Sequence, residues 1–233
     1  MLFNKDLSII ITASYIPSHP EIRIIKEVIE SLHLINYPPN TLIILAHDYD
    51  NHPDYYEYFK NLTEFIKDKR NFKIVFRKKH GHLTGNIRHA LEYVDSEFIL
   101  VLQHDLKFNK RKLDIMKIIE DMKLHPELKH IRFNKRSNRA TNCDSYYNLF
   151  GKEIKCNNYT YTRTNAWSDN NHICPTKYYR DFVMQVCKDG RPMEKYLLLK
   201  AKNEKDHLIT GTYLFGPVED KAYIKHLDGR NSK

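Results

Sequence analysis

Apolar, β-branched runs typical of buried strands alternate with segments of helical periodicity through the first half of the chain. The expected strands are residues 7–12, 41–46, 72–76 and 97–102. The expected helices are residues 21–32, 55–68 and 86–94. Such an alternation is typical of a largely parallel sheet with helices on both faces. The sequence therefore predicts an α/β fold with a mixed, mostly parallel sheet flanked by helices.

The second half of the chain is less regular. Helical spacing marks residues 113–122, 175–187 and 193–201, and strand-like runs mark residues 130–133, 207–215 and 222–226. Residues 137–164 are polar and aromatic, which favours loops and short edge strands. The composition changes near residue 110, without a linker or an internal repeat. Because 233 residues suit one domain, we expect a single domain, residues 1–233, with halves at 1–110 and 111–233.

The chain carries a formal net charge of +9. An excess of this size favours anionic partners: nucleic acid, phosphorylated small molecules or an acidic membrane surface. No apolar run approaches the ~20 residues needed to cross a bilayer. We therefore expect no transmembrane segment, and peripheral contact with a membrane stays open.

The four cysteines form no Cys-x-x-Cys pair, which argues against a zinc ribbon. They are Cys143, Cys156, Cys174 and Cys187. A chain of this length needs no disulfide framework to fold. We expect reduced thiols and a cytoplasmic protein.

Polar clusters follow the predicted strands at the points where those strands end. They are residues 12–15, 47–50, 80–88 and 103–105. Ligands of open α/β sheets bind beyond the carboxyl ends of the strands. We therefore expect these clusters to lie along one edge of the sheet and to form the functional site.

The most specific indication of a functional site is the apolar strand at residues 97–102, which is followed directly by Gln103, His104 and Asp105. A carboxylate at the tip of a buried strand is held rigidly and can ligate a hard divalent cation. The alternative interpretation is an aspartate that caps a turn.

The first half resembles the GT-A glycosyltransferases, particularly the family 2-like members. Residues 12–15 look like the loop that grips the donor nucleobase, and Asp48 falls where the family places a carboxylate on the base. Residues 85–91 look like the Gly/Asn/Arg helix start, and Gln103-His104-Asp105 stands at the DxD position. The resemblance implies a GT-A, Rossmann-like fold with a nucleotide-sugar-binding half (1–110) and an acceptor-binding half (111–233).

The same resemblance implies a set of donor-binding residues. They are Thr12, Tyr15, Asp48, Asn86, Arg88, Gln103 and Arg230. The donor would be a nucleotide sugar, and the acceptor a hydroxyl on a glycan, a lipid or a protein. Transfer would invert the sugar configuration.

One departure from the family pattern concerns the metal. Gln103 replaces the first aspartate of DxD and brings no charge. Many GT-A enzymes take a further ligand from a C-terminal histidine, and His226 follows the last predicted strand. The resemblance therefore implies Asp105 and His226 as ligands of Mn²⁺ or Mg²⁺, with the donor diphosphate completing the shell.

The acceptor hydroxyl must lose a proton as it attacks, and a carboxylate within hydrogen-bond reach can take it. Glu194 stands at the start of a predicted helix, at the interval where the family places its base. Asp169 is the second candidate. Residues 165–172 combine the single tryptophan with Asp, Asn and His, which suits sugar binding.

Three other classes of protein compete with this interpretation. A nucleotidyltransferase usually opens with a Gly-rich, basic phosphate loop, and residues 12–20 contain no Gly or Lys. A two-metal nuclease needs several clustered acids, and only Asp105 lies at the strand that ends in Gln103 and His104. The sequence also contains no helix-turn-helix, zinc-finger or RNP-like pattern. We therefore expect no nucleic-acid partner. A non-catalytic nucleotide- or nucleic-acid-binding protein on a degenerate GT-A scaffold stays open, because it would explain Gln103.

Overall fold

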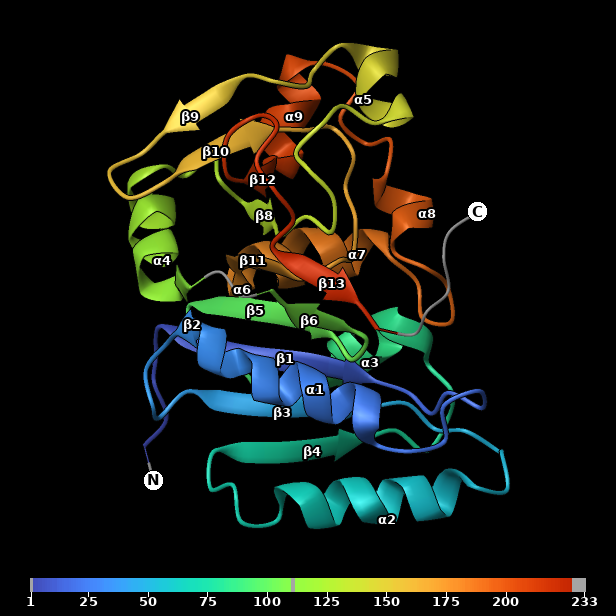
Figure 1. The fold of residues 1–233 in the computed structure, drawn as a ribbon. Helices are drawn as coiled ribbons and strands as arrows, with labels where there is room; N and C mark the ends of the chain where they lie inside the picture. The colour runs from blue at the N-terminus through green and yellow to red at the C-terminus, as the bar shows by residue number, and fades with distance from the viewer. Residues whose placement is uncertain (1, 110–111, 228–233) are drawn as a thin grey trace.

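The computed structural model describes residues 2–109 and 112–227. In this part of the chain, the main sheet has nine strands in the order β4-β3-β1-β5-β11-β8-β12-β10-β9 (Figure 1). The strands of the first half are β1 (Leu7–Ala13), β3 (Leu42–His47), β4 (Phe72–Phe76) and β5 (Phe98–Gln103). Those of the second half are β8 (His130–Arg132), β9 (Glu153–Lys155), β10 (Thr160–Arg163), β11 (His172–Pro175) and β12 (Thr212–Phe215).

The strands of the first half are all parallel. β1 lies between β3 and β5, and β3 also pairs with β4. The predicted ranges agree with the observed strands to within one residue. Parallel pairing brings the carboxyl ends of β1, β3 and β5 to the same edge of the sheet, where Thr12 pairs with both Ala46 and Gln103.

The second half extends the same sheet with strands of both directions. β11 is antiparallel to β5 and to β8, β12 is parallel to β8, and β10 is antiparallel to β12 and β9. The predicted mixed, mostly parallel α/β sheet is confirmed. The sheet runs through both halves of the chain without a break.

Helices cover the sheet on both faces, as the alternation of side chains along β1 requires. Ile9 and Ile11 pack in the same core as α1 (Arg23–Ser31), α2 (Tyr55–Ile66) and α4 (Ile115–Leu124). Ile10 packs in a second core with α3 (His82–Leu91) and the helical segment α6 (Thr176–Tyr178), Tyr179–Val183 and α7 (Met184–Val186). Figure 1 shows α1 in front of the sheet and α3 behind it.

Two small sheets complete the fold. The strand β2 (Ile35–Asn36), which follows the 3₁₀ turn Leu32–Leu34, pairs with β7 (Leu113–Asp114). The strand β6 (Leu106–Phe108) is antiparallel to β13 (Ile224–His226), and Leu106 is the partner of His226. This pairing returns the C-terminal part of the chain to the carboxyl end of β5.

Three sequence-based boundaries in the second half were wrong. Residues 207–210 belong to α9 (Glu204–Thr210) and not to a strand, because Asn203 caps this helix and Gly211, with φ of 52°, ends it before β12. The predicted helix 193–201 shrinks to α8 (Glu194–Leu197). The stretch expected as loops and edge strands contains α5 (Asn142–Tyr147), which a capping box between Thr141 and Asp144 stabilises.

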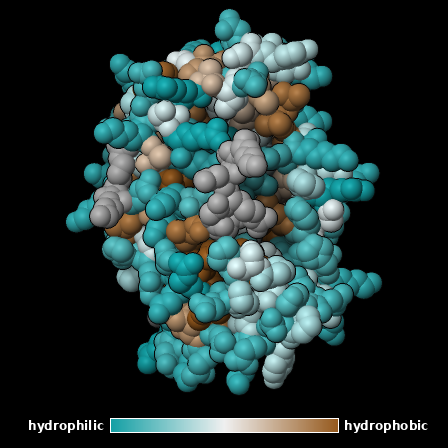
Figure 2. Space-filling model, turned by 45° about the vertical axis from the view of Figure 1, so that its right-hand side comes forward, coloured by the Kyte–Doolittle hydropathy of each residue, from teal (hydrophilic) through white to brown (hydrophobic). Residues whose placement is uncertain are grey.

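The described surface is largely hydrophilic where Figure 2 displays it, and its hydrophobic side chains lie in small, separate patches. None of the helices in the described part of the chain is long and apolar enough to cross a membrane.

Candidate active site

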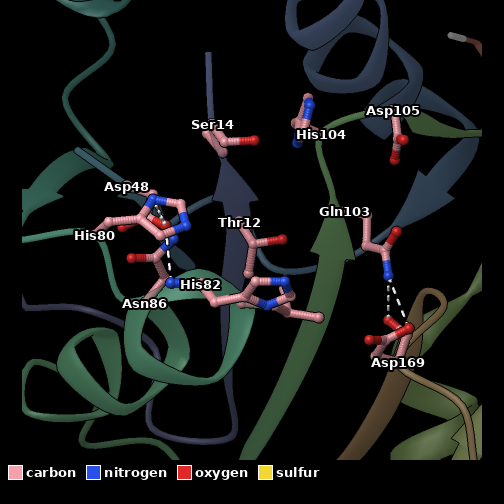
Figure 3. Close-up of a pocket in the computed structure, with 12 residues that line it drawn as sticks. Thr12, Ser14, Asp48, His80, His82, Asn86, Gln103, His104, Asp105 and Asp169 are labelled. Atoms are coloured by element: carbon pink, nitrogen blue, oxygen red, sulfur yellow. Dashed lines mark hydrogen bonds and ion pairs between the residues drawn. The ribbon is translucent and has the colours of Figure 1, made fainter. Parts of the chain in front are cut away.

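The polar strand ends of the first half meet around a cavity of about 480 Å³ at the carboxyl edge of β1, β3 and β5 (Figure 3). Its lining residues are Thr12, Ala13, Ser14, Asp48, His80, His82, Leu83, Asn86, Gln103, His104, Asp105 and Asp169. Figure 3 shows Asp48, His80 and Asn86 on one side, and Asp105, Gln103 and Asp169 on the other. The cavity therefore has two chemically distinct ends.

Asp48 anchors the first end. Its buried carboxylate accepts hydrogen bonds from the backbone N–H groups of Gly81 (2.8 Å) and His82 (2.9 Å), and lies 3.0 Å from Nδ1 of His80. The carboxylate therefore fixes the loop that leads from β4 into α3. His82 takes a left-handed conformation, with φ of 56°, which is unusual for a residue with a side chain.

Asn86 and Arg88 lie on different sides of α3, since two residues along a helix are separated by about 200°. Asn86 lines the cavity, and its buried Oδ1 has no hydrogen-bond partner among the described residues. Arg88 points away from the cavity, where its Nε donates to Asp189 (2.9 Å) and its Nη2 donates to the carbonyls of Met184 and Cys187. The structure does not bring Arg88 to the cavity, and its guanidinium holds the segment after α7 in place.

Gln103 holds Asp169 at the second end of the cavity. Its amide Nε2 donates to the backbone carbonyl of Asp169 (2.9 Å) and to the Oδ1 of the same residue (3.1 Å), as the dashed lines in Figure 3 show. The backbone N–H of Gln103 donates to Oδ1 of Asn171 (2.9 Å). An amide at this position can bridge to a neighbouring carboxylate without the repulsion that a second carboxylate would bring.

Asp105 stands next to His226. The distance from Nε2 of His226 to Oδ2 of Asp105 is 3.2 Å, and Leu227 N–H donates to the carbonyl of Asp105. Oδ1 of Asp105 is buried and has no hydrogen-bond partner among the described residues. The β6–β13 pairing thus brings together the two residues that the sequence predicts as metal ligands.

Asp169 and Glu194 lie close together, but they differ in their access to the cavity. Asp169 lines it, whereas Glu194 does not and instead accepts a hydrogen bond from Oγ of Ser168 (2.6 Å). Burial and the neighbouring Glu194 carboxylate raise the pKa of Asp169 to about 7. A carboxylate with such a pKa exchanges protons readily near neutral pH.

Three further residues predicted to bind the donor differ in their position relative to the cavity. Thr12 lines the cavity, and its Oγ1 donates to the carbonyl of Leu102 (3.2 Å). Tyr15 is buried outside the lining, where its ring packs against His52 and Tyr58. Arg230 lies outside the described residues. The structure therefore does not bring Tyr15 to the cavity.

Trp167 also differs from its expected place in a sugar pocket. It is fully buried, and its ring stacks on His130 at 4.9 Å between centroids. Only Asp169 from this stretch lines the cavity. The tryptophan is a core residue, packed against His130 of β8 and His172 of β11.

Six residues that line the cavity were not predicted as site residues: Ala13, Ser14, His80, His82, Leu83 and His104. Each lies in one of the polar clusters that follow the predicted strands. Their position after a strand end was the available signal, but only the packed loops show which of them face the cavity.

A family model described as "Glycosyl transferase family 2" matches residues 15–184. The chain belongs to glycosyl transferase family 2. The matched region contains Asp48, the start of α3, Gln103-His104-Asp105 and Asp169. As a member of glycosyl transferase family 2, the chain has the GT-A fold that its motifs predicted.

Solved structures with this fold include S. aureus TarS. TarS 1-349 superposes with a TM-score of 0.54 at 17% identity, covering 95% of this chain and 60% of that one. TarS 1-349 in complex with UDP-GlcNAc gives a TM-score of 0.56 at 15% identity, covering 97% and 60%. The chain thus spans about 60% of the length of these relatives. No curated protein sequence matches the chain.

Proposed function

We propose that this family 2 protein transfers a sugar from a nucleoside-diphosphate sugar to a hydroxyl acceptor. The observation that carries the proposal is the cavity itself, in which an anchored nucleoside-side carboxylate, Asp48, lies across from Asp105 and Asp169. A nucleotide sugar has the same order of parts: a base, a charged diphosphate and a reactive sugar. Its base would lie at the Asp48 end, held also by the Thr12 and Asn86 side chains, and its sugar at the Asp169 end.

The residues at the second end fit a divalent cation, Mn²⁺ or Mg²⁺. Oδ1 of Asp105 is buried without a hydrogen-bond partner among the described residues, and an imidazole nitrogen lies 3.2 Å from Oδ2. The described residues contain no cluster of three or more His, Cys, Asp and Glu side chains for a metal. Asp105 and His226 would therefore supply two ligands, and the donor diphosphate and water the others. When bound there, the cation would offset the negative charge of the departing diphosphate.

We assign the base to Asp169 rather than to Glu194. Asp169 lines the cavity and Glu194 does not, and a general base must reach the proton that it removes. In an inverting single displacement, the acceptor oxygen forms the new bond to the anomeric carbon as the bond to the diphosphate breaks. The hydroxyl proton passes to a carboxylate oxygen of Asp169, whose pKa near 7 suits this exchange.

UDP-GlcNAc is the first donor to test, since a TarS structure of the same fold binds it. The decisive measurement is a thermal shift with UDP, GDP and dTDP, each with and without Mn²⁺. Nucleotide at ~100 times its dissociation constant should stabilise the protein by about 2.7 kcal/mol. Metal-dependent stabilisation by one nucleotide, followed by release of that nucleotide from its sugar donor, supports the proposal.

One observation favours a second candidate, a non-catalytic nucleotide-binding protein. Gln103 replaces a charged DxD residue, and its amide is engaged with Asp169. This candidate predicts stabilisation by nucleotide without dependence on Mn²⁺ and without release of UDP from UDP-GlcNAc. No stabilisation by any nucleotide contradicts both candidates.

A further inference from the structure

His82, the first residue of α3, has a backbone conformation that residues with side chains rarely adopt. Its φ is 56°, in the left-handed region that favours glycine. The backbone N–H of His82 donates to Oδ2 of Asp48 (2.9 Å), and that of Gly81 donates to Oδ1 (2.8 Å). Because both bonds come from the backbone, they hold the left-handed turn without help from the imidazole. The turn therefore does not account for a histidine at this position.

The side chain of His82 faces the cavity. In the view of Figure 3, its ring lies between Asp48 on one side and the Gln103–Asp169 pair on the other. Its Nδ1 is buried and has no hydrogen-bond partner among the described residues. Asn86, one helical turn further along α3, also lines the cavity with a buried oxygen that these residues leave unpaired. Backbone strain and unpaired buried groups are concentrated at functional sites.

The charge of the cavity narrows the kind of group that His82 can bind. Three aspartates line the cavity, and its described lining contains no lysine or arginine. A diphosphate that enters brings further negative charge. Besides a metal ion, imidazoles are the groups of this lining that can carry positive charge and donate hydrogen bonds to phosphate. They belong to His80, His82 and His104.

The other two imidazoles of the lining have partners within the protein. Nδ1 of His80 lies 3.0 Å from Oδ2 of Asp48. His104 also has a partner in the fold. His82 meets the ring of His80 edge-on, at 6.3 Å between centroids, and this contact leaves its Nδ1 unpaired. The contacts of the cavity therefore favour His82 as the imidazole that binds a ligand.

We propose that His82 binds the donor through a hydrogen bond from its imidazole to a phosphate oxygen of the nucleotide. An imidazole carries at least one N–H donor, and hydrogen bonds to anionic oxygens are stronger than those between neutral groups. Asp48 acts as a positioning residue, because it holds the turn from which the ring projects. The inference rests on the proposed function for the nucleoside diphosphate and adds a residue that contacts its phosphates.

The test compares the wild type with His82→Gly, which keeps both backbone hydrogen bonds to Asp48. The probes are UDP, GDP or dTDP, whichever stabilises the wild type, and the matching nucleoside, which lacks the phosphates. Affinity for the nucleotide should fall about tenfold, as for the loss of one hydrogen bond to a charged group. Affinity for the nucleoside should stay unchanged. Equal nucleotide affinity in His82→Gly and the wild type would overturn the inference, and so would an equal loss for nucleotide and nucleoside.

Urea unfolding separates binding by the ring from support of the fold. Glycine adopts the left-handed conformation without steric cost, so His82→Gly should unfold at the same urea concentration as the wild type or at a higher one. A lower midpoint together with weaker binding of both probes would mean that the ring supports the fold, and it would contradict the inference. His82→Asn tolerates the left-handed region and keeps an N–H donor, so it should recover part of the affinity that glycine loses.

Glu219→Gly is the matched control. Glu219 also has a left-handed backbone, with φ of 64°, but it is exposed and lies outside the cavity lining. The substitution should raise the urea midpoint and leave nucleotide affinity unchanged. A tenfold loss of affinity in this control would contradict the inference, because binding would then respond to any glycine at such a turn.

The outcomes distinguish this inference from the proposed function. Unchanged nucleotide affinity in His82→Gly, in a protein that transfers sugar, overturns the inference alone. The expected loss of affinity in a protein that releases no nucleotide from a sugar donor contradicts the proposed transfer alone. If none of the three nucleotides binds the wild type, both are wrong.

Discussion

Nε2 of His226 lies 3.2 Å from Oδ2 of Asp105, although the two residues stand far apart in the sequence, in different halves of the chain. The antiparallel pairing of β13 with β6 produces this contact, because it sets His226 opposite Leu106, the residue after Asp105. The pairing fixes the distance between the backbones of β6 and β13, and the side chains of Asp105 and His226 meet where these strands end. The contact therefore places a carboxylate and an imidazole at one edge of the cavity.

Asp105→Asn should remove the Mn²⁺-dependent part of the stabilisation by UDP. The amide keeps the shape of the side chain but lacks the charge that attracts a hard cation. Thermal shift with UDP, with and without Mn²⁺, measures this difference. His226→Ala should reduce the same component, and His125→Ala, which removes a surface histidine beside Glu127, should leave it intact. Full metal dependence in Asp105→Asn would contradict the assignment.

The rate of sugar transfer should rise with pH through about 7. The pKa of Asp169 is raised to about 7, so the group is protonated below that pH and becomes a competent base above it. The profile of kcat/KM from pH 5.5 to 8.5 measures this limb. Asp169→Asn should lose at least about a hundredfold in rate, since general-base catalysis contributes 10²–10⁴-fold. Nucleotide binding should survive, which separates loss of the base from loss of the fold.

Gln103→Asp, which restores a full DxD sequence, should slow transfer at pH 7 instead of improving it. The new carboxylate would replace an amide that donates to Asp169 at 3.1 Å. A second carboxylate beside Asp169 would repel it and disfavour its charged form, which raises the pKa of the base further. The rising limb should therefore move to higher pH. A faster enzyme whose pH profile rises at the same pH as that of the wild type would show that Gln103 does not support Asp169.

Arg88→Ala should destabilise the fold without weakening the binding of nucleotide. The substitution removes the contact with Asp189 and leaves two backbone carbonyls, of Met184 and Cys187, without their donor. Loss of such hydrogen bonds costs about 1–3 kcal/mol. Urea unfolding measures the loss, and titration with UDP measures binding. A tenfold weaker affinity for UDP at unchanged stability would return Arg88 to the donor site.

The sequence by itself determined the first half of the fold. The strands β1, β3 and β5 are apolar runs bounded by polar clusters, and their side chains are buried on both faces, so the pattern left few alternatives. Once these strands are parallel, their carboxyl ends share an edge, and Asp48, Asn86 and Asp105 must approach one another. This part of the site was therefore predictable from local pattern and from chain direction.

The tertiary structure decided what local pattern cannot express. The packing of α3 turns Asn86 toward the cavity and Arg88 toward Asp189, and the packing of Tyr15 against His52 and Tyr58 keeps that ring out of the cavity. The contact between Gln103 and Asp169 joins residues from β5 and from the loop before β11, and no spacing in the sequence encodes it. Such relationships depend on how distant segments pack, because the direction of a side chain is fixed only when its neighbours are in place.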